Sequence, residues 1–133
     1  LLNKRSGLLG LTGQNDLREV DKLVADGNEE ARIALDVYAY RIRKYIGAYA
    51  LALGRLDAIT FTAGVGENAP SMRERVLSGL EGLGISLSAQ RNAVRSADPR
   101  LISSDDSRVA VLVVPTNEEL EIARQCVSVV SAQ

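Results

Sequence analysis

The residues best placed to do chemistry form a turn between a predicted strand and a predicted helix. Residues 59–63 alternate apolar and hydroxyl side chains, which predicts a strand, and Gly64 and Gly66 then permit backbone angles that a β-carbon forbids. A helix is expected to start at Pro70, so free backbone N–H groups would gather over residues 66–71. Such groups lie at the positive end of a helix dipole, and a phosphate can bind there.

This turn also has a purely steric explanation, because turns of this kind join strands to helices in most α/β proteins. Neither common nucleotide motif is complete. The third glycine of the dinucleotide fingerprint is missing, with Ala69 near its place, and no lysine followed by serine or threonine completes a Walker loop. Ser71 and Glu74 match a capping box for the helix. The turn alone therefore leaves a ligand site and a structural turn both open.

Composition narrows the chemistry that the chain can perform. The 133 residues include 16 basic and 17 acidic ones without a run of like charge, which argues against nucleic acid or an anionic membrane as the main partner. One cysteine and no histidine exclude a disulfide framework, a Cys/His zinc site, a serine triad and a histidine base. Carboxylates, arginines, hydroxyls and backbone N–H groups remain, and these suit phosphate and magnesium.

The sequence has no stretch of the length that a membrane helix needs. The longest apolar stretch, residues 46–53, is far shorter than the roughly 20 residues required, and no segment resembles a secretory signal. We therefore expect a cytoplasmic location. The chain opens at Leu1 inside an apolar run, which we interpret as the cut end of a longer chain.

The first predicted elements are a loop and a short helix. Residues 7–13 are apolar but interrupted by glycines, which we interpret as a buried loop. Asn15 or Asp16 can cap a helix that runs to about Val24 and is closed by Gly27. Its inner face would comprise Leu17, Val20 and either Leu23 or Val24. From the residues alone, we favour a helix cap for Asp16 and a surface charge for Arg18 over a functional role for the pair.

The longest predicted helix covers residues 29–53, with Asn28 as its cap and Gly54 at its end. One stripe is polar and comprises Glu29, Arg32, Asp36 and Arg43. The apolar residues cover much more than one face and comprise Ile33, Val37, Tyr40, Tyr45, Ile46, Tyr49, Ala50, Leu51 and Leu53. So short a chain supplies few elements to cover them, so we expect a partner surface, with burial inside one monomer as the alternative.

The second half of the chain predicts two strand-helix units with parallel strands. The first helix would end near Leu83, with Met72, Val76, Leu77, Leu80 and Leu83 inward and Arg73, Glu74, Arg75 and Glu81 outward. Residues 101–102 could form an edge strand, whereas residues 109–114 are uniformly apolar, as in a parallel strand buried on both faces. After Pro115, a capping box of Thr116 and Glu119 would open a helix. Its residues Leu120, Ala123, Val127 and Val130 would face the sheet, with Cys126 a buried thiol.

Both turns would then lie at the carboxyl edge of the sheet. The connection between the two parallel strands is expected to be right-handed, as in other βαβ units. The glycine turn and residues 117–119 would therefore face one crevice.

Three stretches of the chain carry a resemblance to a known family. They are residues 3–10 (Asn-Lys-x-Ser-Gly-Leu-Leu-Gly), 62–68 (Thr-Ala-Gly-Val-Gly-Glu-Asn) and 114–120 (Val-Pro-Thr-Asn-Glu-Glu-Leu). In order and spacing they closely resemble the carboxyl-terminal part of the acetate kinases. Each motif alone is moderately specific, the three in register are strongly so, and the likeness covers the whole chain.

The resemblance implies an actin-like fold, in which two ribonuclease-H-like domains close on ATP and dimers form through the carboxyl-terminal domains. Residues 1–133 would be an incomplete carboxyl-terminal α/β domain with long helices packed on a small mixed or parallel sheet. The implied reaction transfers the γ-phosphoryl group of ATP to acetate, giving acetyl phosphate and ADP, and is reversible. The implied partners are therefore ATP or ADP, acetate or acetyl phosphate, Mg²⁺, and a second copy of the chain.

The resemblance also assigns site residues by position. Those implied to hold the adenosine are Asp16, Leu17 and Arg18, where the family commonly has another apolar residue in place of Leu17. Those implied to form the nucleotide loop are Gly64, Val65, Gly66, Glu67 and Asn68. Glu118 is implied to help hold Mg²⁺.

The catalytic groups of the family are expected upstream of Leu1. They comprise the amino-terminal phosphate loop, the transition-state arginines, the catalytic aspartate and histidine, and the acetate pocket. Phosphoryl transfer depends on positioning and charge from both walls of a cleft, so this segment alone is expected to be inactive.

Three alternatives remain open. A propionate or butyrate kinase would share every motif seen here. A nucleotide-dependent interaction module of the actin or heat-shock chaperone type would share the fold, although residues 64–68 and 117–120 argue against it. The third alternative is a structural fragment that folds only as part of a dimer.

Overall fold

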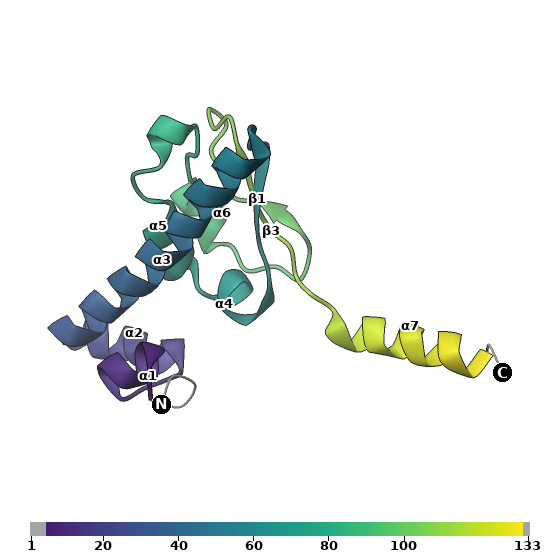
Figure 1. Cartoon of the computed structure of the whole chain (residues 1–133), viewed down its shortest axis with the longest axis horizontal. Coiled ribbons are helices and arrows are strands. Elements are labelled where there is room, and N and C mark those ends of the chain that lie inside the picture. Colours follow the sequence, from purple (N-terminus) through teal and green to yellow (C-terminus); the bar gives the residue numbers. More distant parts are fainter. Residues whose placement is uncertain (1–4, 132–133) are drawn as a thin grey trace.

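A computed structural model describes residues 5–131 and shows a body of helices on a small sheet, from which the last helix projects (Figure 1). In chain order the elements are α1 (Gly7–Thr12), α2 (Leu17–Ala25), α3 (Glu29–Leu53), β1 (Ala58–Phe61), α4 (Ala63–Asn68), α5 (Pro70–Leu77), the 3₁₀ helix η1 (Glu81–Leu83), α6 (Ala89–Ala93), β2 (Arg100–Leu101), β3 (Ala110–Val113) and α7 (Glu118–Ser131). Part of the first motif of the resemblance, residues 3–4, lies outside the described residues. Within residues 5–131, no helix has the length and apolarity needed to cross a membrane.

The sheet has three strands in the order β1-β3-β2. β1 and β3 are parallel, as the βαβ prediction requires, and pair from Ala58 with Ala110 to Phe61 with Val113. β2 is antiparallel to β3 at the other edge, which confirms the edge strand and makes the sheet mixed. The predicted burial of β3 on both faces was wrong. Val111 and Val113 are fully buried, but the alternate residues are only half-buried because the helices cover one face of this small sheet.

Helix α3 has the predicted bounds and both predicted end signals. The Asn28 side chain accepts the Ala31 backbone N–H at 2.9 Å, and Gly54 at the other end has a φ of 73°, which favours glycine. The side chains that α3 buries are mostly small: Ala31, Ala34, Leu35 and Ala39. On the polar stripe, Arg32 bridges Glu29 and Asp36. Asp36 also pairs with Arg75 of α5, which ties the two helices together.

The two amino-terminal helices differ in how well they were predicted. α2 begins after its cap Asp16 and buries Val20 against the core, as expected. Residues 7–12 form helix α1, so the interpretation as a buried loop was wrong. Leu11 is 54% exposed, and no residue of α1 is buried. The glycines mark the helix ends, since Gly7 and Gly13 have positive φ, and they do not break the segment into a loop.

The glycine turn is itself a helix of six residues, α4. The residue with positive φ is Ala63, at 59°, and neither Gly64 nor Gly66 has positive φ, which corrects the expected role of the two glycines. Gly66 is instead needed for close approach. A β-carbon on it would lie 3.2 Å from the backbone carbonyl carbon of Phe61 in β1. The expected set of free N–H groups is also reduced, since Ala69 N–H bonds the Val65 carbonyl.

Helix α5 starts at Pro70 as expected, but its predicted cap and length were wrong. Ala69 occupies the N-cap position and no side chain caps the helix, so Ser71 and Glu74 do not form a capping box. The helix ends at Leu77, and Leu83 is 54% exposed on η1, where the chain turns away from the core. Arg73, expected in solvent, is 1% exposed because its guanidinium binds backbone carbonyls inside the fold.

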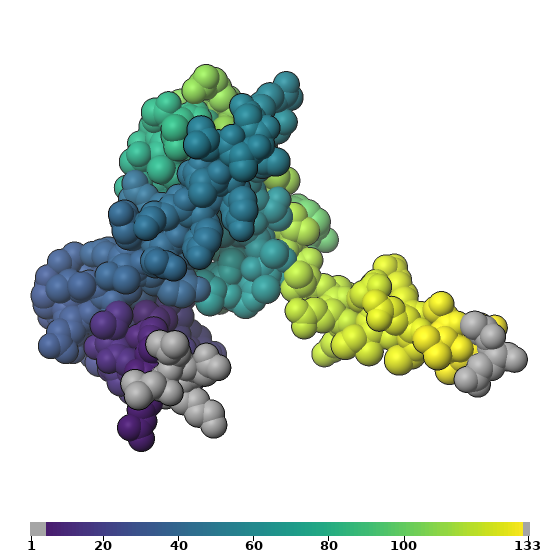
Figure 2. Space-filling view, in the orientation of Figure 1, coloured from purple at the N-terminus to yellow at the C-terminus, as the bar shows by residue number. Residues whose placement is uncertain are grey.

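Helix α7 projects from the body (Figures 1 and 2). No other part of the described chain covers its predicted inner face. Its start also differs from the capping-box prediction. Asn117 caps it by accepting the Leu120 N–H at 3.0 Å, because Thr116 is held by Glu67 instead. The residues expected to face the sheet are not buried, and these are Leu120, Ala123, Val127 and Val130. Cys126 is exposed for the same reason, so the buried thiol was wrong.

Candidate nucleotide site

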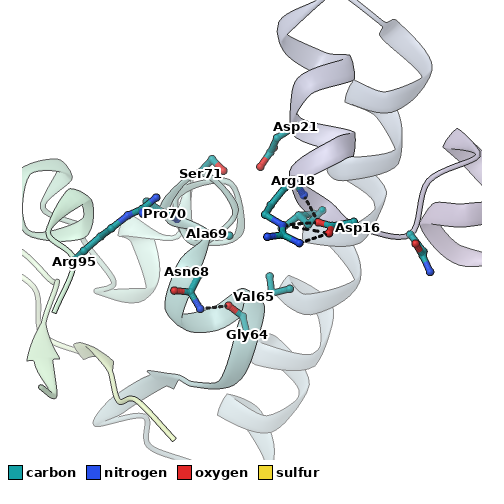
Figure 3. Close-up of a pocket in the computed structure, with 12 residues that line it drawn as sticks. Asp16, Arg18, Asp21, Gly64, Val65, Asn68, Ala69, Pro70, Ser71 and Arg95 are labelled. Carbon is teal, nitrogen blue, oxygen red and sulfur yellow. Dashed lines mark hydrogen bonds and ion pairs between the residues drawn. The ribbon is translucent and has the colours of Figure 1, made fainter. Parts of the chain in front are cut away.

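A cavity of about 950 Å³ lies between the start of α2 and the α4–α5 turn (Figure 3). Residues far apart in the sequence meet there. Its lining residues are Asn15, Asp16, Leu17, Arg18, Asp21, Gly64, Val65, Asn68, Ala69, Pro70, Ser71 and Arg95. The walls are therefore a helix start with charged side chains on one side and a glycine-containing helix on the other.

Asp16 and Arg18 form a closed pair on the α2 side of the cavity. The Asp16 carboxylate accepts the Arg18 backbone N–H at 2.9 Å, which caps α2, and the Arg18 Nε at 3.0 Å. The second carboxylate oxygen accepts Arg18 Nη2 at 2.5 Å. Hydrogen bonding from the Arg18 side chain, and then from its backbone, lowers the pKa of Asp16 to about 2. Arg18 is thus oriented by Asp16 while its side chain stays 86% exposed at the cavity.

Helix α4 presents a side with little side-chain bulk to the cavity. A β-carbon on Gly64 would meet nothing within 4 Å, so the backbone there is open to close approach by another molecule. The Asn68 amide Nδ2 donates to the Gly64 carbonyl at 2.9 Å, which fixes the Asn68 side chain across the helix (Figure 3). Val65 lines the same wall and is 37% exposed.

Glu67 points toward the chain segment that leads into α7. Its Oε1 accepts the Thr116 backbone N–H at 2.8 Å and the Thr116 hydroxyl at 3.0 Å. The Thr116 backbone N–H is the main reason that the pKa of Glu67 is lowered, so the side chain is a carboxylate at neutral pH. Glu67 does not line the cavity. Glu67 instead joins α4 to the segment after β3.

Arg73 holds the other end of α4 from inside the fold. Its Nη1 donates to the carbonyls of Gly66 at 2.7 Å and Glu67 at 3.0 Å. Its Nε and Nη2 donate to the side chain and the backbone carbonyl of Asn92 at 2.7 and 2.8 Å. Burial, and then the neighbouring Arg100, lowers the pKa of Arg73 to about 10, so the guanidinium keeps its charge at neutral pH.

Glu118 stands two residues after the Thr116 anchor, on the first turn of α7. It is exposed and is not among the residues that line the cavity. In residues 5–131, no three histidine, cysteine or acidic side chains gather where they could hold a metal. Mg²⁺ commonly takes only one or two carboxylates and completes its shell with water and substrate phosphates, so a single glutamate fits that chemistry.

The cavity thus brings together six of the residues implied by the resemblance. They are Asp16, Leu17, Arg18, Gly64, Val65 and Asn68. Gly66, Glu67 and Glu118 lie outside its lining, with Gly66 against β1 and Glu67 on Thr116. Sequence reasoning missed Asp21 and Arg95, which have no distinguishing pattern, and it missed Arg73, which reads as an ordinary charge on a helix.

Comparisons with known proteins agree on one family. The sequence profile of the Acetokinase family matches residues 1–124. Acetate kinase of Streptomyces avermitilis is 56% identical over 130 residues, and that of Leifsonia xyli subsp. xyli is 58% identical over 132. The matches cover 98% and 99% of this chain but 32% and 33% of the relatives. The chain therefore spans about a third of the length of the curated relatives it matches.

Two solved structures extend the comparison to the fold. The crystal structure of Porphyromonas gingivalis acetate kinase matches 98% of this chain and 33% of its own, with a TM-score of 0.87 and 44% identity. A propionate kinase from Francisella tularensis subsp. tularensis matches 92% of this chain and 31% of its own, with a TM-score of 0.82 and 41% identity. The fold described above is therefore part of the fold of these kinases.

Proposed function

Because the chain belongs to the Acetokinase family, we propose that residues 1–133 are part of the carboxyl-terminal nucleotide-binding domain of a kinase that transfers the ATP γ-phosphoryl group to acetate. The observation that carries the proposal is the cavity in which the start of α2 faces α4. It joins the two segments that the resemblance assigns to the nucleotide, although they lie far apart in the sequence.

Each wall of the cavity has a suitable chemistry for a nucleotide. On one wall, a planar guanidinium held by a carboxylate can stack on a base, and this is the role of Arg18 and Asp16, with Leu17 as apolar contact. On the other, Gly64 lets the backbone approach a ligand closely, while Val65 and Asn68 flank it. Gly66 and Glu67 complete the loop by holding α4 against β1 and Thr116.

In the proposed reaction, no group of this chain forms a covalent bond with a substrate. An acetate oxygen attacks the γ-phosphorus of ATP, the bond to the β-phosphate oxygen breaks, and acetyl phosphate and ADP result. Mg²⁺, when bound with the nucleotide, offsets phosphate charge, and Glu118 is the residue that would help to hold it. This segment supplies one wall of the cleft, and the catalytic groups belong to the part of the enzyme that it does not contain. The cytoplasmic location stays a prediction.

A second copy of the chain is the proposed partner of α3. Large apolar side chains on this helix are exposed, and among them Tyr40, Tyr45, Tyr49, Leu51 and Leu53 are each more than half exposed. Tyr45 and Tyr49 stack with ring centroids 6.2 Å apart, so these two rings form one exposed apolar patch on the helix. Exposed apolar side chains around so much of the helix favour association. This supports a homodimer formed through α3.

A propionate kinase is the second candidate. The structural match to a propionate kinase supports it, because that match is almost as close as the match to an acetate kinase. The nucleotide wall does not contact the acyl group, so it does not discriminate between the two acids. A non-catalytic interaction module is the third candidate, and it predicts nucleotide binding without transfer.

The test is a phosphoryl-transfer assay on the complete protein that carries this segment, with ATP and each of acetate, propionate and butyrate. The proposal predicts the highest kcat/KM with acetate and no product from the isolated 133-residue chain above a mock preparation. A preference for propionate would support the second candidate. Absence of transfer to any acid by the complete protein would contradict a kinase function.

A further inference from the structure

Arg73 is a buried cation that no carboxylate pairs with in the described chain. Arg73 is 1% exposed. Among residues 5–131, the only other buried polar or charged residues are Asn92 and Ser103. The ion pairs among residues 5–131 join other residues and do not include Arg73. Its guanidinium instead donates hydrogen bonds to backbone carbonyl oxygens and to the amide oxygen of Asn92. Removing a cation from water is costly, and burying one without a carboxylate is unusual unless its hydrogen bonds are all well made.

Two of those hydrogen bonds are made to the carboxyl end of α4. The last carbonyls of a helix lack partners within the helix and carry partial negative charge. Arg73 Nη1 lies 2.7 Å from the Gly66 carbonyl and 3.0 Å from the Glu67 carbonyl, which are two of these groups. A cation from α5 therefore caps α4 from the interior. The other edge of the guanidinium is fixed to Asn92 of α6, and Asn92 Nδ2 in turn donates to the Pro70 carbonyl at 3.0 Å.

Helix α4 has little else to keep it formed. It has six residues, which is too short for a helix to persist without tertiary support, and none of them is buried. Its first residue, Ala63, has a φ of 59°. This backbone conformation is unfavourable for any residue that has a β-carbon. The structure must supply the free energy that holds this conformation. Apart from Arg73, the contacts that do so include Gly66 against Phe61, the Glu67 bond to Thr116, and a longer bond of 3.5 Å from Arg100 Nη2 to the Glu67 carbonyl.

We propose that Arg73 is the positioning residue of α4: its buried guanidinium holds the carboxyl end of the helix and thereby fixes Gly64, Val65 and Asn68 at the cavity wall. The first part concerns the geometry of α4. The consequence for nucleotide affinity rests on the proposed function. Arg73 does not line the cavity, so it acts through α4 and not by touching the nucleotide.

The shape of the guanidinium distinguishes this role from that of a charge alone. The planar fork reaches two carbonyls of α4 on one edge and Asn92 on the other, whereas a lysine ammonium is a point charge on a flexible stem. Arg73→Lys should therefore keep part, but not all, of the hold on α4 that Arg73→Gln loses. Val76→Ala is the matched control, because Val76 is fully buried on the same helix and its loss lowers stability without removing a bond to α4.

The experiment measures two quantities on the complete protein. Amide hydrogen exchange without nucleotide reports on residues 63–68, and steady-state kinetics report KM for ATP and for acetate separately. Relative to Val76→Ala, we expect Arg73→Gln to speed exchange in α4 and to raise KM for ATP roughly tenfold, the scale of a lost charge-assisted hydrogen bond. KM for acetate should stay within about twofold of its value in Val76→Ala. The exchange rate and the KM for ATP of Arg73→Lys should lie between those of Val76→Ala and Arg73→Gln.

The outcomes separate the inference from the proposed function. If exchange over residues 63–68 in Arg73→Gln matches that in Val76→Ala, Arg73 is only a stabilising core residue and the inference is overturned. If exchange speeds up but KM for ATP does not change, Arg73 positions α4 as inferred, and α4 has no part in binding the nucleotide. Faster exchange with a selective rise in KM for ATP supports both.

Discussion

Gly64→Ala should separate an effect on the proposed nucleotide binding from an effect on folding. Gly64 lies inside α4 and its φ is not positive, so alanine fits its backbone conformation. A β-carbon there would meet no protein atom within 4 Å. Alanine is about 1 kcal/mol more favourable than glycine in a helix, so the variant should be as stable as the parent or more stable by roughly 0.5–1 kcal/mol.

The same β-carbon would stand at the wall of the cavity. If the backbone at Gly64 approaches the nucleotide, an added methyl group must displace it, at a cost of about 1–3 kcal/mol by analogy with overpacked cores. That cost corresponds to a rise in KM for ATP on the order of tenfold to a hundredfold. KM for acetate should not follow, because the resemblance implies an acetate pocket upstream of Leu1.

Gly66→Ala is the control, because it is expected to lower stability whereas Gly64→Ala is not. Its β-carbon would lie 3.2 Å from the carbonyl carbon of Phe61 and 3.4 Å from its Cβ, so α4 must move off β1. We expect a loss of about 1–3 kcal/mol in stability, partly offset by the better helix propensity of alanine. Thermal melts and steady-state kinetics on the complete protein give both quantities. Unchanged KM for ATP in a fully stable Gly64→Ala variant would refute the placement of the nucleotide against α4.

Three further changes test separate parts of the account. Tyr45→Glu places a charge in the exposed apolar face of α3 and should shift sedimentation toward the monomer, while a monomeric parent protein would disprove association through that face. Glu118→Ala should lower turnover and raise the Mg²⁺ requirement, and the neighbouring Glu119→Ala should do neither; equal Mg²⁺ titrations for the two would remove the metal role. The Asp16 carboxyl should titrate by NMR near pH 2, and in Arg18→Met its pKa should rise toward 3.8. Because folding lowers this pKa, the stability it contributes is present above about pH 4 and is lost as the pH falls toward 2; an unchanged pKa in Arg18→Met would show that Arg18 is not its cause.

Local signals in the sequence predicted the elements whose ends are set by their own residues. The bounds of α3 follow from Asn28 and Gly54, which act within one turn of the helix, and the cap of α2 follows from Asp16 in the same way. The parallel pairing of β1 with β3 also followed from their apolar patterns.

The errors occurred where a distant residue decides the local structure. The capping box at Thr116 failed because Glu67, far away in the sequence, binds the Thr116 N–H and hydroxyl. Arg73 reads as a surface charge, since nothing in its neighbours reveals that the end of α4 folds over it. The inner face of α7 was predicted from periodicity, which shows that a face is apolar but not what covers it.

The resemblance pointed to residues of the candidate site that periodicity could not. Nothing in the local pattern links Arg18 with Val65, yet both line one cavity. Asp21 and Arg95 line it as well and belong to no motif, so only the three-dimensional arrangement identifies them. Composition had limited the chemistry to carboxylates, arginines, hydroxyls and backbone groups, and the cavity lining includes two carboxylates, Asp16 and Asp21, and two arginines, Arg18 and Arg95.

The most direct test of the central claim is to locate the bound nucleotide on the complete protein. Photolabelling with 8-azido-ATP, with ATP as competitor, followed by peptide mapping, reports which segments lie beside the adenine. The account predicts label in peptides that contain residues 15–18 or 63–71, and its loss when ATP is added. Label that ATP displaces but that maps outside both segments would contradict the claim that this cavity is the nucleotide site.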